Sequence, residues 1–189
     1  MPDQGSEGLF SPYLRKKRIA ACYPFLYGRI LDVGCSSGEL AAFVPTEKYL
    51  GVDTDKESLK IAKIKYPHHR FKCELPNVNT QFDTIASLAV IEHVDNPDAF
   101  LHGLAELLTP GPKSRIILTS PHPIAEEMLY LGSRIRLFSR SANEEHTNLL
   151  SQNDFLKLAA VCDLRMSHYR RFLFGINQLV VYQKTGLDL

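Results

Sequence analysis

Two aspartates and two glycines in the first third of the chain have the types and spacing to hold a small charged ligand. Asp32 and Gly34 lie in the apolar run Ile30-Leu31-Asp32-Val33-Gly34, and Gly38 follows four residues later. Glycines at such a turn let the backbone bend sharply and approach a ligand closely. Asp53 ends a second apolar run, twenty-one residues after Asp32. In a doubly wound sheet both carboxylates would lie at the carboxyl edge, where Asp53 could accept hydrogen bonds from both hydroxyls of a ribose.

The spacing of the glycines bears on which nucleotide would bind. A dinucleotide site uses Gly-x-Gly-x-x-Gly ahead of a helix whose N-terminal amides meet the pyrophosphate. This chain instead has Gly-x-x-x-Gly, with Asp32 two residues before the first glycine. A carboxylate there would repel a phosphate but suits a ligand that carries an ammonium and a sulfonium. The pattern favours S-adenosylmethionine (SAM), while a dinucleotide-dependent oxidoreductase stays open as an alternative.

The elements that would position these residues alternate between strands and helices. Strands are expected at 29–33, 48–52, 71–73, 82–88, 115–119, 164–170 and 179–183. Helices are expected at 12–27 (with an early end or a break at Pro24), 39–44, 55–65, 97–108 and 151–162. Near-continuous apolar strands separated by helices predict βαβ units in a mainly parallel sheet. The last two strands have no helix between them, so an antiparallel hairpin is expected.

These patterns define the fold class as α/β, a Rossmann-like doubly wound sheet of seven strands with one antiparallel strand. Residues 1–10 are expected to form a flexible leader, and residues 11–189 a single domain. Three local expectations accompany this fold. Leu59, Ile61, Ala62 and Ile64 are available to pack from the helix at 55–65. Ser151 and Asp154 resemble a capping box, and the basic run 15–18 is expected to be solvated at a helix end.

Several segments, in order along the chain, resemble the motifs of class I SAM-dependent methyltransferases of the ubiquinone-biosynthesis-like branch. The resemblance covers roughly Arg29 to Pro121. Its segments are 30–38 (ILDVGCSSG, the first motif), 51–55 (GVDTD, the acidic second strand), 82–88 (FDTIASL, the fourth strand), 90–94 (VIEHV), 108–111 (LTPG) and 115–121 (RIILTSP, the fifth strand). Ser36 stands where the family usually has glycine, and a serine with negative φ would fit there.

The resemblance implies a set of cofactor-binding residues. Ser87 and Leu88 would lie beside the methionine part of SAM, and Glu74 would take the place of the aspartate that usually lies beside the adenine. The complete set is Asp32, Gly34, Cys35, Ser36, Gly38, Asp53, Thr54, Glu74, Ser87 and Leu88. Two of them have simpler alternatives. Asp53 could cap a helix, and Cys35 is expected to be a small buried residue and not a nucleophile.

Histidines supply candidates for the acceptor side. His93 and His122 each follow an expected strand and are candidate general bases with a near-neutral pKa. Tyr23, His122 and His146 are candidate substrate contacts. The expected reaction moves a methyl group to O, N or C of a small-molecule acceptor, because the chain has no large insertion. A non-catalytic SAM-binding or scaffold domain is the other alternative, since no base is obvious from the sequence.

Bulk composition excludes several other classes. Among 189 residues, 44% are hydrophobic and the formal net charge is +1, so no nucleic-acid partner is expected. No apolar stretch approaches the roughly 20 residues needed to span a membrane, and the polar start does not resemble a signal peptide. The four cysteines lack metal-ligand or disulfide-framework spacing. No metal site is therefore expected, and reduced thiols suggest a cytoplasmic protein. The sequence does not indicate the oligomeric state.

Overall fold

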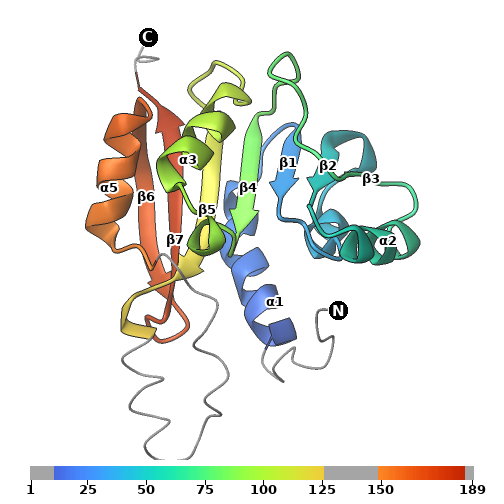
Figure 1. The fold of residues 1–189 in the computed structure, drawn as a ribbon, viewed down its shortest axis with the longest axis horizontal. Coiled ribbons are helices and arrows are strands. Elements are labelled where there is room, and N and C mark those ends of the chain that lie inside the picture. The colour runs from blue at the N-terminus through green and yellow to red at the C-terminus, as the bar shows by residue number, and fades with distance from the viewer. Residues whose placement is uncertain (1–10, 126–148, 186–189) are drawn as a thin grey trace, which may run out of the picture.

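A single sheet organises the part of the chain described by the computed structural model, residues 11–125 and 149–185. Helices lie on both faces of this sheet (Figure 1). Its seven strands are β1 (Ile30–Val33), β2 (Tyr49–Val52), β3 (Arg70–Lys72), β4 (Thr84–Leu88), β5 (Arg115–Pro121), β6 (Leu164–Phe172) and β7 (Asn177–Lys184). The helices are α1 (Ser11–Cys22), α2 (Lys56–Lys65), α3 (Pro97–Glu106) and α5 (Gln152–Val161). Short 3₁₀ segments are η1 (Tyr23–Phe25), η2 (Glu39–Phe43), η3 (Thr46–Lys48) and η4 (Ile91–His93).

The strand order is β3-β2-β1-β4-β5-β7-β6. Neighbouring strands from β3 to β5 are parallel, and β7 pairs antiparallel with both β5 and β6. The expected α/β fold class is thus confirmed, with β7 as the one reversed strand. The order switches beside β1, because β2 and β4 flank it on opposite sides. Ligands bind at such a switch point, outside the carboxyl ends of the strands.

Each face of the sheet buries its own hydrophobic cluster. Leu31, Ile85 and Ile116 pack with α3 and α5 on one face, where Figure 1 shows both helices in front of the sheet. Ile30, Ala86 and Ile117 pack on the other face, with α1, η2 and α2. This alternation of side chains along each strand explains why the strand runs are apolar throughout. Residues at the carboxyl edge therefore sit on a rigid frame.

Helix ends follow the expected capping chemistry. Asp55 caps α2, accepting hydrogen bonds from the backbone N–H groups of Glu57 and Ser58. Ser151 and Asp154 form the predicted capping box at α5. Pro97 occupies the first turn of α3, whose cap is Asn96. These side chains satisfy backbone donors that the helix itself leaves unpaired.

Four expectations need correction. The segment after the glycine turn is not an α-helix but the 3₁₀ helix η2, which ends where Pro45 interrupts the backbone donors. Helix α3 ends at Glu106, two residues before the expected end. Strand β4 begins at Thr84 and not at Phe82, because Phe82 forms only an isolated bridge to Leu108. On α2, Leu59 and Ala62 are buried as expected, whereas Ile61 and Ile64 are exposed. The sheet contacts only one narrow stripe of this ten-residue helix.

The basic run on α1 is also not uniformly solvated. Lys16 and Lys17 are exposed, but Arg15 and Arg18 are only partly exposed. Residues three apart share one helix face, and this face is turned toward the rest of the protein. Arg18 Nε donates to Asn177 Oδ1 at the start of β7, at 3.1 Å. Arg170 Nη2 donates to Ala21 O at 3.2 Å, so two arginines tie α1 to the β6–β7 hairpin.

Candidate cofactor site

A pocket of about 440 Å³ lies at the carboxyl ends of β1, β2 and β4. This volume falls within the range of about 300–1,000 Å³ that is usual for small-molecule sites. The segments after three neighbouring strands meet there, as expected at the switch point of the sheet. Its lining residues are Val33, Gly34, Ser36, Val52, Asp53, Thr54, Cys73, Leu75, Ala89, Val90, His93 and Phe100.

The glycine turn has the conformation that its glycines permit. Gly34 and Gly38 have φ angles of 75° and 82°, in the left-handed region that favours glycine. A Cβ atom on Gly34 would clash with Val90 Cγ2. The N–H groups of Gly34 and Cys35 both donate to Val52 O, at 2.9 and 3.1 Å. The turn is therefore fixed to the end of β2 and lies directly against the segment that follows β4.

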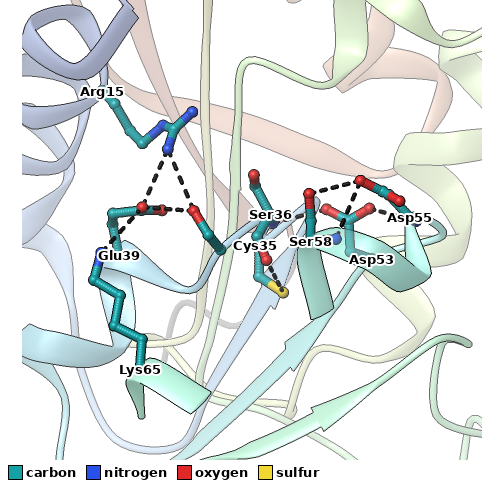
Figure 2. Close-up of polar contacts among 9 residues, drawn as sticks. Arg15, Cys35, Ser36, Glu39, Asp53, Asp55, Ser58 and Lys65 are labelled. Atoms are coloured by element: carbon teal, nitrogen blue, oxygen red, sulfur yellow. Dashed lines mark hydrogen bonds and ion pairs between the residues drawn. The ribbon is translucent and has the colours of Figure 1, made fainter. Parts of the chain in front are cut away.

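Ser36 departs from expectation. Its φ angle is 47°, so it does not adopt the negative value that the sequence analysis allowed for a serine. This positive φ angle is explained by the backbone N–H of Ser36, which donates a hydrogen bond to Asp53 Oδ2 at 2.7 Å (Figure 2). A non-glycine residue in this region costs of order 1–3 kcal/mol and persists only where its surroundings hold it. Asp53 provides that constraint.

Asp53 is the central polar side chain of the pocket. One carboxylate oxygen accepts from Ser36 N–H, and the other accepts from Asp55 N–H at 2.9 Å. Asp53 does not cap α2, since Asp55 fills that role. A carboxylate offers about four acceptor positions, so two remain beyond the two backbone bonds. Two further acceptor positions, held rigidly in a pocket, match the demand of a ribose with two neighbouring hydroxyls.

Asp32 lies elsewhere. Its side chain is 3% exposed, does not line the pocket, and accepts a hydrogen bond from Tyr49 Oη at 2.7 Å. Burial raises the pKa of Asp32 to about 7, although the Tyr49 bond opposes the shift. Asp32 therefore sits beneath the glycine turn, on the face of the sheet that carries Tyr49 and Cys35.

Arg15 contacts the glycine turn from outside, a role that its place in the sequence did not predict. Its Nη1 atom lies 3.1 Å from Glu39 Oε1 and 3.5 Å from Ser37 Oγ (Figure 2). Lys65 of α2 approaches the same Glu39 oxygen at 3.3 Å. Burial opposes ionisation of Glu39, but the Ser37 hydrogen bond and both cations leave its pKa below the ordinary value. The signal available in the sequence was the spacing of Arg15 and Arg18.

The other predicted cofactor residues differ in whether they line the pocket. Thr54 lines the pocket beside Asp53. Glu74 is exposed and does not line it, although its neighbours Cys73 and Leu75 do. Ser87 is fully buried, and its Oγ has no hydrogen-bond partner within the described residues. The remaining two, Leu88 and Cys35, do not line the pocket. Leu88 packs into the core, and burial followed by the charge of Asp32 raises the pKa of the Cys35 thiol.

The two candidate bases have different surroundings. His93, in η4, is exposed and lines the pocket. His122 is partly exposed, and its Nδ1 accepts a hydrogen bond from Ile124 N–H at 3.1 Å. A neutral imidazole that accepts at Nδ1 carries its proton on Nε2, so His122 is poorly arranged to take a further proton. Tyr23 is exposed and meets Phe43 edge-on, with ring centroids 6.0 Å apart. His146 lies outside the described residues.

The apolar walls of the pocket were not evident from the sequence. Val33 and Val52 end β1 and β2, Leu75 follows β3, and Ala89 and Val90 follow β4. Ala89 has a φ angle of 61°, which turns the chain sharply after the strand. Within residues 11–125 and 149–185, no group of three His, Cys, Asp or Glu side chains is placed to hold a metal ion. In the same ranges, no helix is long and apolar enough to cross a membrane.

The comparisons with known proteins match this segment and this fold. Residues 31–113 match a family described as a methyltransferase domain. A SAM-dependent methyltransferase from Clostridium acetobutylicum superposes with a TM-score of 0.68 at 15% identity, covering 94% of this chain and 96% of that one. The segment 31–113 therefore matches a methyltransferase domain, and the chain has the fold of class I SAM-dependent methyltransferases. Magnesium protoporphyrin IX methyltransferase from Synechocystis, solved with S-adenosylhomocysteine (SAH), gives a TM-score of 0.68 at 15% identity, over 97% and 90% of the two chains.

Curated relatives of this methyltransferase domain include two ubiquinone biosynthesis O-methyltransferases. The protein from Pseudoalteromonas translucida is 33% identical over 95 residues, which cover 43% of this chain and 39% of the relative. The protein from Alkalilimnicola ehrlichii is 30% identical over 110 residues, covering 52% and 44%. The matched region thus spans less than half the length of either relative.

Ser36→Gly is expected to stabilise the methyltransferase domain by about 0.5–1 kcal/mol. Glycine adopts a positive φ without steric cost, although its greater freedom in the unfolded chain offsets part of the gain. Thermal unfolding would show a melting temperature higher by about 2 °C. Ser36→Ala keeps the strained backbone and serves as the control. A melting temperature below that of the parent protein for Ser36→Gly would contradict the strain assigned to Ser36.

Proposed function

We propose that this protein transfers a methyl group from SAM to a hydroxyl of a small-molecule acceptor. The observation that carries the proposal is Asp53, which keeps two acceptor positions inside a pocket at the switch point of the sheet. When bound, SAM supplies a methyl group that its sulfonium already activates. The protein has to bind and orient SAM and the acceptor and to exclude water. In-line positioning of the two reactants alone can supply much of the acceleration.

Each part of the pocket has a role in holding the cofactor. Asp53 would accept hydrogen bonds from the ribose hydroxyls. The exposed side of the pocket at Thr54, Cys73 and Leu75 would contact the adenine. Gly34, which has no side chain of its own and packs against Val90, would let the methionine part approach the backbone at the turn. The unpartnered, buried Ser87 Oγ at the end of β4 supports placing a polar ligand near that strand end.

The geometry argues against a dinucleotide. The short 3₁₀ segment η2 follows the glycine turn, so no long helix directs its N-terminal amides at a pyrophosphate. Asp53 also places a carboxylate, which would repel a phosphate, in the pocket beside the turn. Both features favour a cationic ligand with a ribose over one with two phosphates.

The relatives support oxygen as the acceptor atom, since those described above are named O-methyltransferases. Because the matched region spans under half the length of either relative, we do not assign the acceptor of these relatives to this protein. We also place the protein in the cytoplasm. All four cysteines are free thiols, which suits a reducing compartment.

Calorimetry with SAH and with NAD tests the cofactor assignment. We expect saturable binding of SAH and none of NAD. Transfer of labelled methyl from SAM to a pool of catechols, phenols and amines then tests the activity and the acceptor atom together. Binding of NAD without SAH would overturn the proposed cofactor. Binding of SAH without any labelled product would favour a non-catalytic SAM-binding domain.

His93→Ala is expected to lower kcat by about a hundredfold or more, the usual range for loss of a general base. His93 lines the pocket, whereas His122 does not. His122→Ala is therefore the matched control and should change kcat less than threefold. Initial rates with labelled SAM give kcat, and calorimetry should show SAH affinity within threefold of the parent in both variants. Equal rates for both variants would exclude His93 as the base.

A further inference from the structure

The outward side of α2 combines positive charge with exposed apolar side chains. Ile61 is 52% exposed and Ile64 is 81% exposed. Leu59 and Ala62 are buried and define the inward side, so at 3.6 residues per turn Ile64 lies nearly opposite them. Exposed isoleucines three residues apart form a small apolar ridge along the helix.

Lysines flank this ridge on both sides. Lys56, Lys60 and Lys63 lie along one flank and Lys65 along the other, and all four are exposed. Lys60 pairs with Glu57 at 2.7 Å, and Lys65 pairs with Glu39 at 3.3 Å. Lys56 and Lys63 take part in none of the ion pairs found among the described residues. We call these four lysines with Ile61 and Ile64 the α2 face.

The charge of this region contrasts with the rest of the chain. Residues 56–72 contain six Lys or Arg and one acidic residue, Glu57, which gives a formal charge of +5. The whole chain carries +1, so the remaining residues together carry −4. The positive charge is therefore concentrated on this segment. Such a segment is attracted to a surface that carries negative charge.

From this combination we propose that the α2 face docks on an anionic lipid surface. Lysines beside an apolar ridge can extend their ammonium groups to lipid phosphates while the ridge enters the interface. A nucleic acid would satisfy the lysines, but its recognition uses phosphate contacts and aromatic stacking, which leave two isoleucines in water. With two apolar residues and four lysines, the binding is weak and reversible. It is independent of the proposed methyl transfer.

The α2 face is oriented so that docking leaves the cofactor site in place. Asp55 caps α2 and directly follows Thr54, which lines the pocket. The side of α2 that packs on the sheet, through Leu59 and Ala62, is opposite the α2 face. A docked protein would thus hold its SAM pocket near the membrane surface without rearranging the sheet.

Flotation of the full-length protein with vesicles tests the proposal. We expect at least tenfold greater binding to phosphatidylcholine vesicles containing 30% phosphatidylglycerol than to pure phosphatidylcholine, and loss of this preference in 0.5 M salt. Ile61→Ser with Ile64→Ser should lower binding at least tenfold, as should Lys56→Gln with Lys63→Gln. The latter pair leaves the ion pairs of Lys60 and Lys65 intact.

Helix α5 offers a matched control. Leu156 and Val161 are 46% and 66% exposed, and their replacement by serine removes a similar apolar area outside the lysine-rich face. This variant should bind vesicles like the parent, and all variants should keep the parent melting temperature and SAH affinity. Equal binding to both vesicle types would overturn the proposal, as would an equal loss in the α5 control. Tight binding to a duplex oligonucleotide that is insensitive to the isoleucine changes would also overturn it, in favour of a nucleic-acid surface.

Discussion

Asp53→Ala is expected to weaken the binding of SAH by at least about a hundredfold. The carboxylate keeps two acceptor positions for the ribose, and hydrogen bonds to a charged group contribute about 1.5–3 kcal/mol each. Loss of about 3 kcal/mol corresponds to two orders of magnitude in Kd. The same change frees Ser36 N–H, whose bond to Asp53 holds the glycine turn. Titration calorimetry of the purified variant with SAH measures the effect directly.

The neighbouring carboxylate provides the control for Asp53. Asp55 caps α2 and does not line the pocket, so Asp55→Asn should lower the melting temperature while leaving SAH affinity within threefold. Asp53→Asn keeps the size of the side chain but turns one acceptor into a donor, and should bind SAH nearly as poorly as Asp53→Ala. If Asp53→Ala bound SAH within threefold of the parent protein, the ribose contact would be wrong.

Asp32→Asn is expected to stabilise the protein at pH 8 by about 4 kcal/mol more than it does at pH 4. Burial raises the pKa of Asp32 to about 7, against an ordinary value near 4 in the unfolded chain. Between these values the folded protein holds a proton that the unfolded chain releases. The stability that Asp32 contributes is therefore fully present below about pH 4 and is lost as pH rises through about 7, at about 1.4 kcal/mol per pH unit. Asparagine does not ionise and escapes this loss.

Urea unfolding of the parent and of Asp32→Asn at each pH unit from 4 to 8 measures the difference, in which other titrating groups cancel. Asparagine can still accept the hydrogen bond from Tyr49. Tyr49→Phe, with Asp32 retained, removes the bond that opposes the pKa shift of Asp32. Its stability should therefore begin to fall at the same pH and continue to fall to a higher pH. Parallel stability curves for the parent and Asp32→Asn would show that Asp32 ionises normally in the folded protein.

Local patterns in the sequence were sufficient for most of the fold. Apolar strand runs separated by helices predicted the parallel strands. The absence of a helix between the last two strands predicted the reversed β7. The capping box at Ser151 and Asp154 also followed from adjacent residues. These features depend on contacts between residues close together in the chain, or on the pattern of apolar side chains along one helix or strand. Both can be recognised without knowing which other elements pack against them.

Helix type and exposure were less predictable. The segment after the glycine turn had the composition of a short helix, but Pro45 left room only for the 3₁₀ turns of η2. Ile61 and Ile64 are apolar and close in sequence to buried residues, yet they face away from the sheet. Hydrophobicity indicates which residues can be buried, whereas the number of neighbours available to α2 decides which ones are.

The glycine turn shows the same division at the site. The sequence determined that a strand would run into Gly34 and Gly38, and that Asp32 and Asp53 would lie near one edge of the sheet. Only the tertiary structure separated the two carboxylates. Asp32 belongs to the body of β1 and points into the layer with Tyr49, whereas Asp53 follows the end of β2 and reaches Ser36 and the pocket. Side chains alternate between the two faces of a strand, and whether the face they meet is packed or open depends on segments distant in the sequence.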